Sequence, residues 1–237
     1  MTKVKFCLLI LTIVSAVNLK ADDVPTISPL ATYQGSDGEE SGTNYSGSAP
    51  LEVQFTANAE NTDGWSAYYE WRFTEEGSDT PYLTRYEENT SYTFTKAGSH
   101  YIKLYAIFTQ GNDTVAYTDE YWESAEAITI NISESKLQMP NAFTPNGDDK
   151  NDIYKAKDGY QSLVEFHAYI FNRWGQKLFE WTDPSTGWDG TYHGKPVKEG
   201  VYYVLVKAKG ADGKVFNIRR DVNLIRDYNE EASTSSN

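Results

Sequence analysis

The chain has 237 residues, of which 18 are tyrosine, 10 phenylalanine and 6 tryptophan, with 34 acidic against 21 basic side chains. The formal net charge of −13 repels nucleic acid and anionic lipid, so neither is an expected partner. The single cysteine, Cys7, excludes an internal disulfide, and the folded state must therefore depend on the burial of side chains.

The first residues have the pattern of a secretory signal peptide. Two lysines precede an apolar run, residues 6–17, which is too short to span a bilayer comfortably. A small residue, Ala21, follows just before two aspartates, so residues 1–21 are predicted to be removed on export. A retained membrane anchor is the alternative, but no stop-transfer pattern follows the run.

Hydrophobic alternation predicts that strands dominate both halves of the chain. In residues 51–57, Leu51, Val53 and Phe55 share one face, while the polar residues between them point the other way. The same alternation recurs over residues 101–108 and 202–208. Turn signals at short intervals separate these runs, as in a β-sandwich and unlike alternating β and α units.

A polar stretch closed by Pro140 divides the chain. We therefore predict a first domain over residues 22–133, a linker over 134–139 and a second domain over 140–227. The tail, residues 228–237, lacks apolar periodicity and is expected to be disordered.

The first domain resembles the PKD family of immunoglobulin-like sandwiches. Residues 68–77 read YYEWRFTEEG, where a strand tryptophan is followed by an aromatic residue and an acidic, Gly-containing turn. Residues 92–108 read YTFTKAGSHYIKLYAIF, with Ala-Gly ahead of a Tyr-rich strand. The resemblance covers roughly residues 25–133 and implies a core that contains Trp71, Phe73, Gly98 and Tyr101.

The alternation of side chains along this strand also predicts that Trp71 belongs to the core. It shares a strand face with Tyr69 and Phe73, which favours core packing over stacking on a ligand. Ahead of this strand, the Gly- and Ser-rich residues 34–48 are expected to form a mobile loop or linker.

Four blocks follow one another in the second domain. They are MPNAFTPNGDDKND at residues 139–152, FNRWGQKLFE at 171–180, GWDGTYHGKPVKEGVYYV at 187–204 and VNLIR at 222–226. In this order they resemble the gliding-motility-associated C-terminal domain, the type B sorting domain of the type IX secretion system of Bacteroidetes.

This second resemblance implies a β-sandwich that an outer-membrane export machine reads, and it makes that machine the expected partner. Such a machine takes folded cargo to the cell surface or outside the cell. The residues that match the motif are Asn141, Phe143, Pro145, Asn146, Gly147, Asp148, Asn151, Asp152, Phe171, Asn172, Arg173, Trp174, Gly175, Trp188, Asp189, Gly190, Gly194, Gly200 and Tyr202. Together the two resemblances predict an all-β chain of two tandem immunoglobulin-like β-sandwich domains after a signal peptide.

Turn chemistry explains much of the aromatic, glycine-rich second block. Asn172 can accept hydrogen bonds from the backbone ahead of it, and Gly175 can take a positive φ, so residues 172–175 are predicted to close a hairpin. Trp174 and Trp188 are then expected to cover edges of the sheet. The alternative is that Trp181 or Trp188 is exposed and stacks on a carbohydrate.

Oxygen-bearing side chains are concentrated in residues 146–152. Asp148, Asp149, Asn151 and Asp152 could coordinate Ca²⁺, the only cofactor or metal that the sequence suggests. Their spacing differs from that of an EF-hand. The alternative is a capped turn in which these side chains accept backbone N–H groups.

No catalytic constellation is evident in the sequence. The three histidines, His100, His167 and His193, are far apart and lack the spacing of paired zinc ligands. Adjacent acidic pairs such as Glu75 and Glu76 are not an acid and a base that converge from separate strands. We therefore expect a non-catalytic protein.

Two functions remain open from the sequence. In the first, the chain is an exported protein that passes through the periplasm to the cell surface or the medium. Its second domain would be the sorting signal, and its PKD-like domain a spacer or an adhesion module that contacts other surface proteins. In the second, the chain is a carbohydrate-binding surface module that uses exposed tryptophans.

Overall fold

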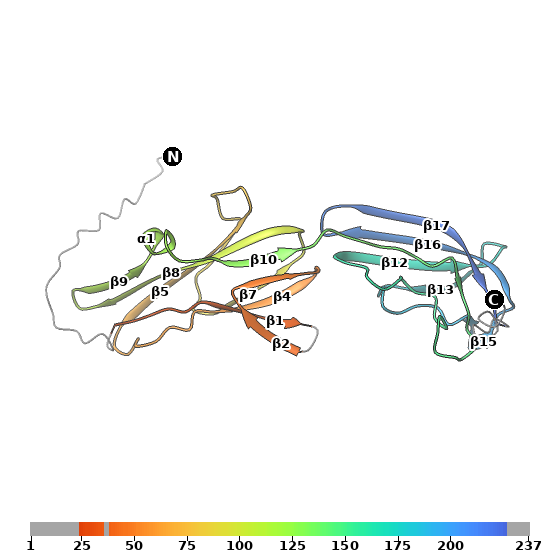
Figure 1. Cartoon of the computed structure of the whole chain (residues 1–237), viewed down its shortest axis with the longest axis horizontal. Coiled ribbons are helices and arrows are strands. Elements are labelled where there is room, and N and C mark those ends of the chain that lie inside the picture. The colour runs from red at the N-terminus through yellow and green to blue at the C-terminus, as the bar shows by residue number, and fades with distance from the viewer. Residues whose placement is uncertain (1–23, 36–37, 227–237) are drawn as a thin grey trace, which may run out of the picture.

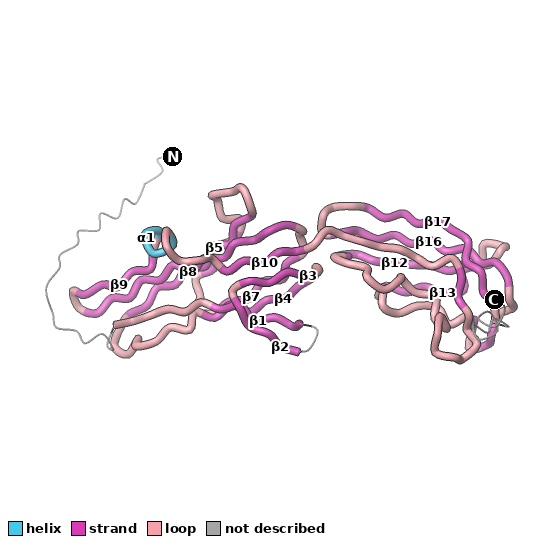
Figure 2. The backbone as a smooth tube through the Cα atoms, in the orientation of Figure 1, coloured by secondary structure: helices cyan, strands magenta, loops and turns pink. Residues whose placement is uncertain are grey.

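The structure, a computed structural model, describes residues 24–35 and 38–226. The predicted signal peptide and tail, residues 1–21 and 228–237, lie outside the described residues. Regular structure in the described part consists of strands and one short helix, α1 (Asp119–Trp122). The strands form two bodies arranged end to end along the long axis (Figure 1 and Figure 2). The prediction of an all-β chain with two tandem β-sandwich domains is confirmed.

The first domain packs two sheets against each other. One has the strand order β2–β1–β4–β7, and the other has the order β3–β10–β8–β5–β6, with β9 paired to β8. The first sheet comprises β1 (Leu30–Gly35), β2 (Gly38–Gly42), β4 (Leu51–Thr56) and β7 (Thr90–Phe94). The second comprises β3 (Asn44–Gly47), β5 (Ser66–Glu75), β6 (Leu83–Arg85), β8 (Gly98–Gln110), β9 (Asp113–Tyr117) and β10 (Ile128–Ile132).

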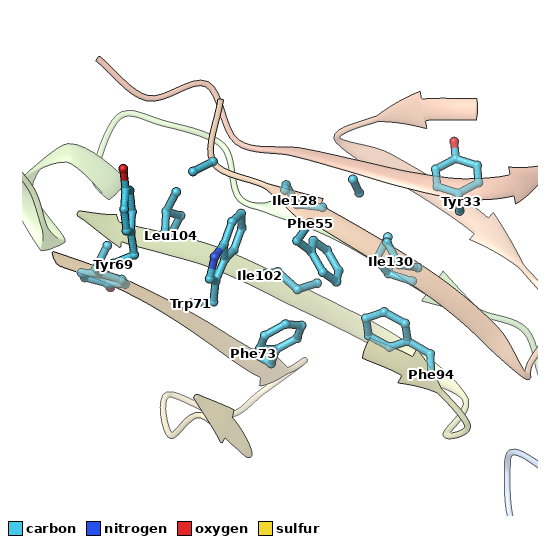
Figure 3. Packing of buried hydrophobic residues seen from close by; sticks show 14 of the residues in the cluster. Tyr33, Phe55, Tyr69, Trp71, Phe73, Phe94, Ile102, Leu104, Ile128 and Ile130 are labelled. Atoms are coloured by element: carbon cyan, nitrogen blue, oxygen red, sulfur yellow. The ribbon is translucent and has the colours of Figure 1, made fainter. Parts of the chain in front are cut away.

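Alternating side chains of both sheets meet in an aromatic core (Figure 3). Phe55 lies at its centre: its ring centroid is 5.3 Å from that of Phe73, edge to face, and 5.8 Å from that of Trp71. Trp71 is fully buried, and its indole N–H points at the carbonyl oxygens of Glu87 and Glu88, at 3.2 and 3.1 Å. The indole is therefore both packed and hydrogen-bonded, as a buried tryptophan requires.

Two residues predicted for this core lie outside it. Along β8 the core-facing residues are even-numbered, from Ile102 to Phe108, so Tyr101 points to the opposite face and is only half-buried. Gly98 is exposed at the start of the same strand, where its φ of +124° suits glycine. The expectation was wrong for both because family resemblance locates the strand but does not decide which side of it faces inward.

The prediction of a mobile loop over residues 34–48 is also wrong. β2 pairs antiparallel with β1, and after Thr43 the chain crosses to the other sheet, where β3 runs parallel to β10. Both are edge strands whose side chains are mostly exposed. Backbone hydrogen bonds hold these edge strands in the sheets although most of their side chains are polar or small. The Gly- and Ser-rich composition of residues 34–48 therefore suggested a loop where the structure has strands.

The second domain is built on one five-stranded sheet in the order β11–β17–β16–β12–β13. One face of this sheet packs against loop segments that carry Leu137, Met139, Tyr154 and Trp188, near the short hairpin β14–β15. The strands are β11 (Ala142–Phe143), β12 (Leu163–Phe171), β13 (Lys177–Trp181), β14 (Thr191–Tyr192), β15 (Lys195–Pro196), β16 (Gly200–Gly210) and β17 (Val215–Leu224).

Polar contacts connect the two domains at a junction centred on Ser162. Its hydroxyl accepts the backbone N–H of Ala49 at 3.1 Å and lies 2.9 Å from the hydroxyl of Ser133. Beside it, the Ala97 N–H donates to the carbonyl oxygen of Ala211 at 3.0 Å. Ser162 is buried, so the junction excludes water from these bonds.

The stretch predicted as a linker is packed along its length. The Ser135 hydroxyl donates to Asp212 at 2.7 Å, and Lys136 and Gln161 exchange two backbone hydrogen bonds of 3.0 Å. Leu137 and Met139 are buried in the core of the second domain. The chain therefore passes from one body to the other with little free length.

The first core yields a stability prediction. Trp71→Ala should destabilise the first domain by about 3–5 kcal/mol, because it leaves a cavity among rigid aromatic side chains. Urea denaturation followed by fluorescence measures this loss. Tyr86→Ala, which removes a ring that is 60% exposed, is the control and should change stability by no more than about 0.5 kcal/mol. Equal effects of the two substitutions would contradict the described packing.

Candidate functional site

In the second domain, the register of the five-stranded sheet brings the four sequence blocks to one end. Phe171 lies opposite both Tyr203 and Lys177, and Gly200 lies opposite Leu224. β11 runs parallel to β17, so Phe143 is beside Leu224 as well. The loops that leave these strands therefore emerge at the same edge of the domain.

We call this edge the distal end, formed by residues 144–152, 172–176, 187–200 and 225–226. At the opposite end of the sheet, β12 begins beside the junction with the first domain. The distal end thus lies as far from the first domain as the second domain extends (Figure 1).

A buried aromatic cluster supports the distal end. The Trp188 ring centroid lies 5.3 Å from that of Phe143 and 5.0 Å from that of Tyr202, and Phe143 is 5.7 Å from Tyr154. The polar atoms of the cluster donate to backbone carbonyls: Trp188 to Thr191 at 2.7 Å and Tyr154 to Pro140 at 3.0 Å. Burial raises the pKa of Tyr154 well above its ordinary value, so this phenol remains a hydrogen-bond donor.

Gly187 makes this cluster possible. The next residue, Trp188, exchanges two backbone hydrogen bonds with Tyr154, of 2.8 and 3.1 Å. A Cβ atom at Gly187 would come within 2.1 Å of the Tyr154 carbonyl oxygen. Only glycine permits this approach, which places the Trp188 indole in the core.

Arg226 fastens the distal loops together, a role that the sequence analysis did not assign. Its guanidinium donates to the carbonyl oxygens of Pro145 at 2.9 Å, Gly190 at 3.1 Å and Val197 at 3.3 Å. Its backbone N–H also donates to the Glu199 carboxylate. In the sequence, Arg226 comes soon after the alternating residues of β17. An arginine at such a strand end has a planar guanidinium with several donors, which can reach the carbonyl groups of neighbouring loops.

The acidic loop is a capped turn in the structure. The two carboxylate oxygens of Asp152 accept the backbone N–H groups of Gly147 and Asp149, both at 2.8 Å. Asp148 accepts the backbone N–H of Lys150 at 2.9 Å. Within the described ranges, no group of three or more His, Cys, Asp or Glu side chains is arranged to hold a metal ion. The structure therefore shows the capped turn that the sequence offered as the alternative for this loop.

The turn between β12 and β13 is organised by Asn172, as its sequence predicted. The Asn172 side-chain oxygen accepts the backbone N–H groups of Trp174 and Gln176, both at 3.0 Å, and its amide donates to the Gln176 side chain at 2.9 Å. Gly175 has a φ of +80°. Trp174 does not cover the sheet: it is 75% exposed, and the Arg173 guanidinium carbon lies 4.3 Å from its ring centroid.

The remaining motif residues occupy turns around these features. The Asn141 carbonyl oxygen accepts the backbone N–H of Asn223, and Asp189 accepts the N–H and hydroxyl of Thr191. Gly190 lies beside Pro145 and Arg226. The other positions are Asn146 and Asn151 in the acidic loop, Phe171 half-buried at the end of β12, Gly194 in the β14–β15 turn and Gly200 at the start of β16.

The carbohydrate hypothesis required exposed tryptophans at position 181 or 188, and this premise is wrong. Trp181 and Trp188 both belong to the buried core of the second domain. The outer face of the sheet does carry a row of rings, in which His167 is stacked on Tyr169 at 4.3 Å and Phe171 follows at 6.2 Å. The rings of His167 and Tyr169 are inclined at 21° and therefore cover one face of each other.

The histidines lie on separate elements. His100 is buried in β8, within hydrogen-bond distance of the Tyr82 hydroxyl, 3.1 Å, and of the Lys96 carbonyl oxygen, 3.0 Å. His167 belongs to the row on β12, and His193 follows β14. Each has a local structural role or is exposed, and none converges with another on a common site.

The acidic loop predicts a dependence of stability on pH. The N–H groups of Gly147 and Asp149 lower the pKa of Asp152 below its ordinary value. A lowered folded-state pKa stabilises the fold above the unfolded pKa of about 3.9, and this contribution is lost as the pH falls below it. Asp152→Asn should therefore lower the Tm at pH 7, and the difference should shrink as the pH approaches about 3.

Thermal melts of the two proteins across this range measure the difference. Asp149→Asn, a matched change in the same loop at an exposed side chain, serves as the control. A difference for Asp152→Asn that stays constant across the pH range would contradict the role assigned to the carboxylate.

Comparison with known families agrees with this arrangement. Residues 41–118 match the PKD domain family, and residues 137–217 match the CHU_C type IX secretion signal domain. The second match includes every motif residue from Asn141 to Tyr202, whereas Arg226 lies beyond it. No curated protein matches the chain. The chain therefore carries a PKD domain followed by a CHU_C type IX secretion signal domain.

Proposed function

We propose that this chain is a non-catalytic surface protein whose second domain, residues 140–227, is its outer-membrane secretion and sorting signal. In this proposal the first domain, residues 22–133, is a spacer or an adhesion module, with the boundary between them at residues 134–139. A type IX secretion signal domain implies recognition by the type IX secretion machinery and export to the cell surface or the extracellular space.

One observation carries the proposal. The motif blocks of the second domain converge on the distal end, where Pro145 of the first block contacts Arg226 of the last, 81 positions away. This end faces away from the first domain, so a receptor could approach it without contacting the cargo (Figure 1). This separation would leave the distal end accessible to the machinery whatever the first domain contacts.

The proposed route begins at the inner membrane. The predicted signal peptide, residues 1–21, would deliver the chain to the periplasm, where the outer-membrane machine would read the folded second domain. Among the described residues, no helix combines the length and apolar character needed to cross a membrane.

The junction supports the role of the first domain as a spacer. Hydrogen bonds accepted by Ser162 and by the carbonyl oxygen of Ala211 join the two domains end to end, and the packed stretch 134–139 leaves little free chain length between them. A fixed, elongated arrangement would hold the far end of the first domain away from the site of attachment. Contacts with other surface proteins would then occur at that outer end.

Deletion of residues 140–237 tests the sorting role. We expect the truncated chain to remain in the periplasm, because the distal end is lost, whereas the complete chain reaches the cell surface or the medium. Cell fractionation and antibody labelling of intact cells measure this distribution. Surface display of the truncated chain would refute the sorting role, and turnover of a substrate by the purified chain would refute the non-catalytic one.

A double variant, Ser162→Ala with Ser135→Ala, tests the spacer role. The double variant removes the Ser162 hydroxyl, which bonds across the junction, and the Ser135 hydroxyl, which bonds beside it. Loss of the Ser162 hydroxyl leaves the buried backbone N–H of Ala49 without its partner, which should lower the free energy of unfolding by about 1–3 kcal/mol. Small-angle scattering should then show a broader range of distances between the two domains. Ser91→Ala, an exposed hydroxyl on β7, is the control. Scattering identical to that of the unsubstituted chain would show that these hydroxyls do not fix the junction.

A further inference from the structure

Trp174 is the exception among the tryptophans of this chain. Of the six, Trp71, Trp122, Trp181 and Trp188 are buried and Trp65 is half-buried, whereas Trp174 is 75% exposed. A large aromatic side chain that stays in water forgoes the gain that it would make on burial. Its exposure therefore calls for an explanation other than folding.

The turn itself does not need Trp174. Asn172 supplies the side-chain oxygen that caps the turn, and Gly175 supplies the positive φ. Position 174 contributes only its backbone N–H, which any residue except proline could provide.

The hydrogen bonds of the turn hold the backbone of Trp174 in place. Besides the bonds from Asn172, the Gln176 side chain donates to the Tyr192 hydroxyl at 3.1 Å, which ties the turn to β14. The Arg173 guanidinium lies over the indole ring. A side chain presented on a rigid support loses little entropy on binding, and Trp and Arg are the residues most enriched in the energetic centres of protein interfaces.

From this geometry we propose that Trp174 and Arg173 form the contact by which the type IX export machinery captures the distal end. The proposal rests on the sorting role of the second domain, and it names the residues that carry it. The partner surface would offer an apolar slot for the indole with a carboxylate at its rim for the guanidinium. The position of the turn, beside the other motif loops and away from the first domain, favours this occupant over a second copy or a glycan.

The test follows export of the complete chain in the producing bacterium. Variants Trp174→Ala and Arg173→Ala are compared with Tyr86→Ala, which removes a 60% exposed ring from the first domain, and with deletion of residues 140–237. Thermal melts of the purified variants establish first that they are folded. Antibody labelling of intact cells then gives the surface fraction, and fractionation gives the periplasmic one.

We expect Trp174→Ala to lower the surface fraction by at least about tenfold, as loss of a central interface tryptophan does to binding. Arg173→Ala should have a smaller effect in the same direction, and Tyr86→Ala none. Normal display of Trp174→Ala, with the deletion variant retained, would overturn this inference and leave the sorting role intact.

Two further outcomes separate the remaining explanations. If the deletion variant also reached the surface, the sorting role itself would fail, and the inference with it. If Trp174→Ala were displayed normally but lost self-association in sedimentation, or binding to a polysaccharide, the inference would be overturned in favour of a second copy or a glycan.

Discussion

The burial of aromatic side chains between strands is the constraint on which both domains depend. With one cysteine in the sequence, no internal disulfide can hold the chain, so the free energy of folding must come from packing. Phe55 meets Trp71 and Phe73 in the first core, and Trp188 meets Phe143 and Tyr202 in the second. The indole N–H groups of Trp71 and Trp188 each donate to a backbone carbonyl oxygen, whereas the indole N–H of Trp181, also buried in the second core, has no hydrogen-bond partner among the described residues.

Most residues of the four sequence blocks serve the architecture of the second domain. Gly187 lets the chain approach Tyr154, Asp152 caps its own loop, and Arg226 gathers three loop carbonyls. Through these contacts the three residues determine the backbone conformation of the distal loops. Trp174 differs from them because it is held by the same framework without being needed by it. The motif blocks of this chain therefore combine residues that build the distal end with a residue that the distal end displays.

The sequence predicted the features that depend on local chemistry. Alternation identified the long strands, and Asn172 with Gly175 identified a hairpin. It failed where the outcome depends on distant partners. The exposure of Trp174 and the burial of Trp188 depend on where the second layer of the domain lies, which no local pattern encodes. The pairing of β3 with β10 depends on an edge more than 80 residues away, and the role of Arg226 on three separate loops.

The path of the chain through the first domain determines how that domain would bear tension. The chain enters at the end away from the junction, runs along β1, and leaves along β10 into the junction (Figure 1). Because the hydrogen bonds of an antiparallel pair are perpendicular to its strands, a force along the long axis would shear those of β1 with β4 and those of β10 with β8. Sheared bonds share a load, whereas bonds that are peeled break one after another. A force that stretches the first domain between its two ends would thus be resisted by these strand pairs together.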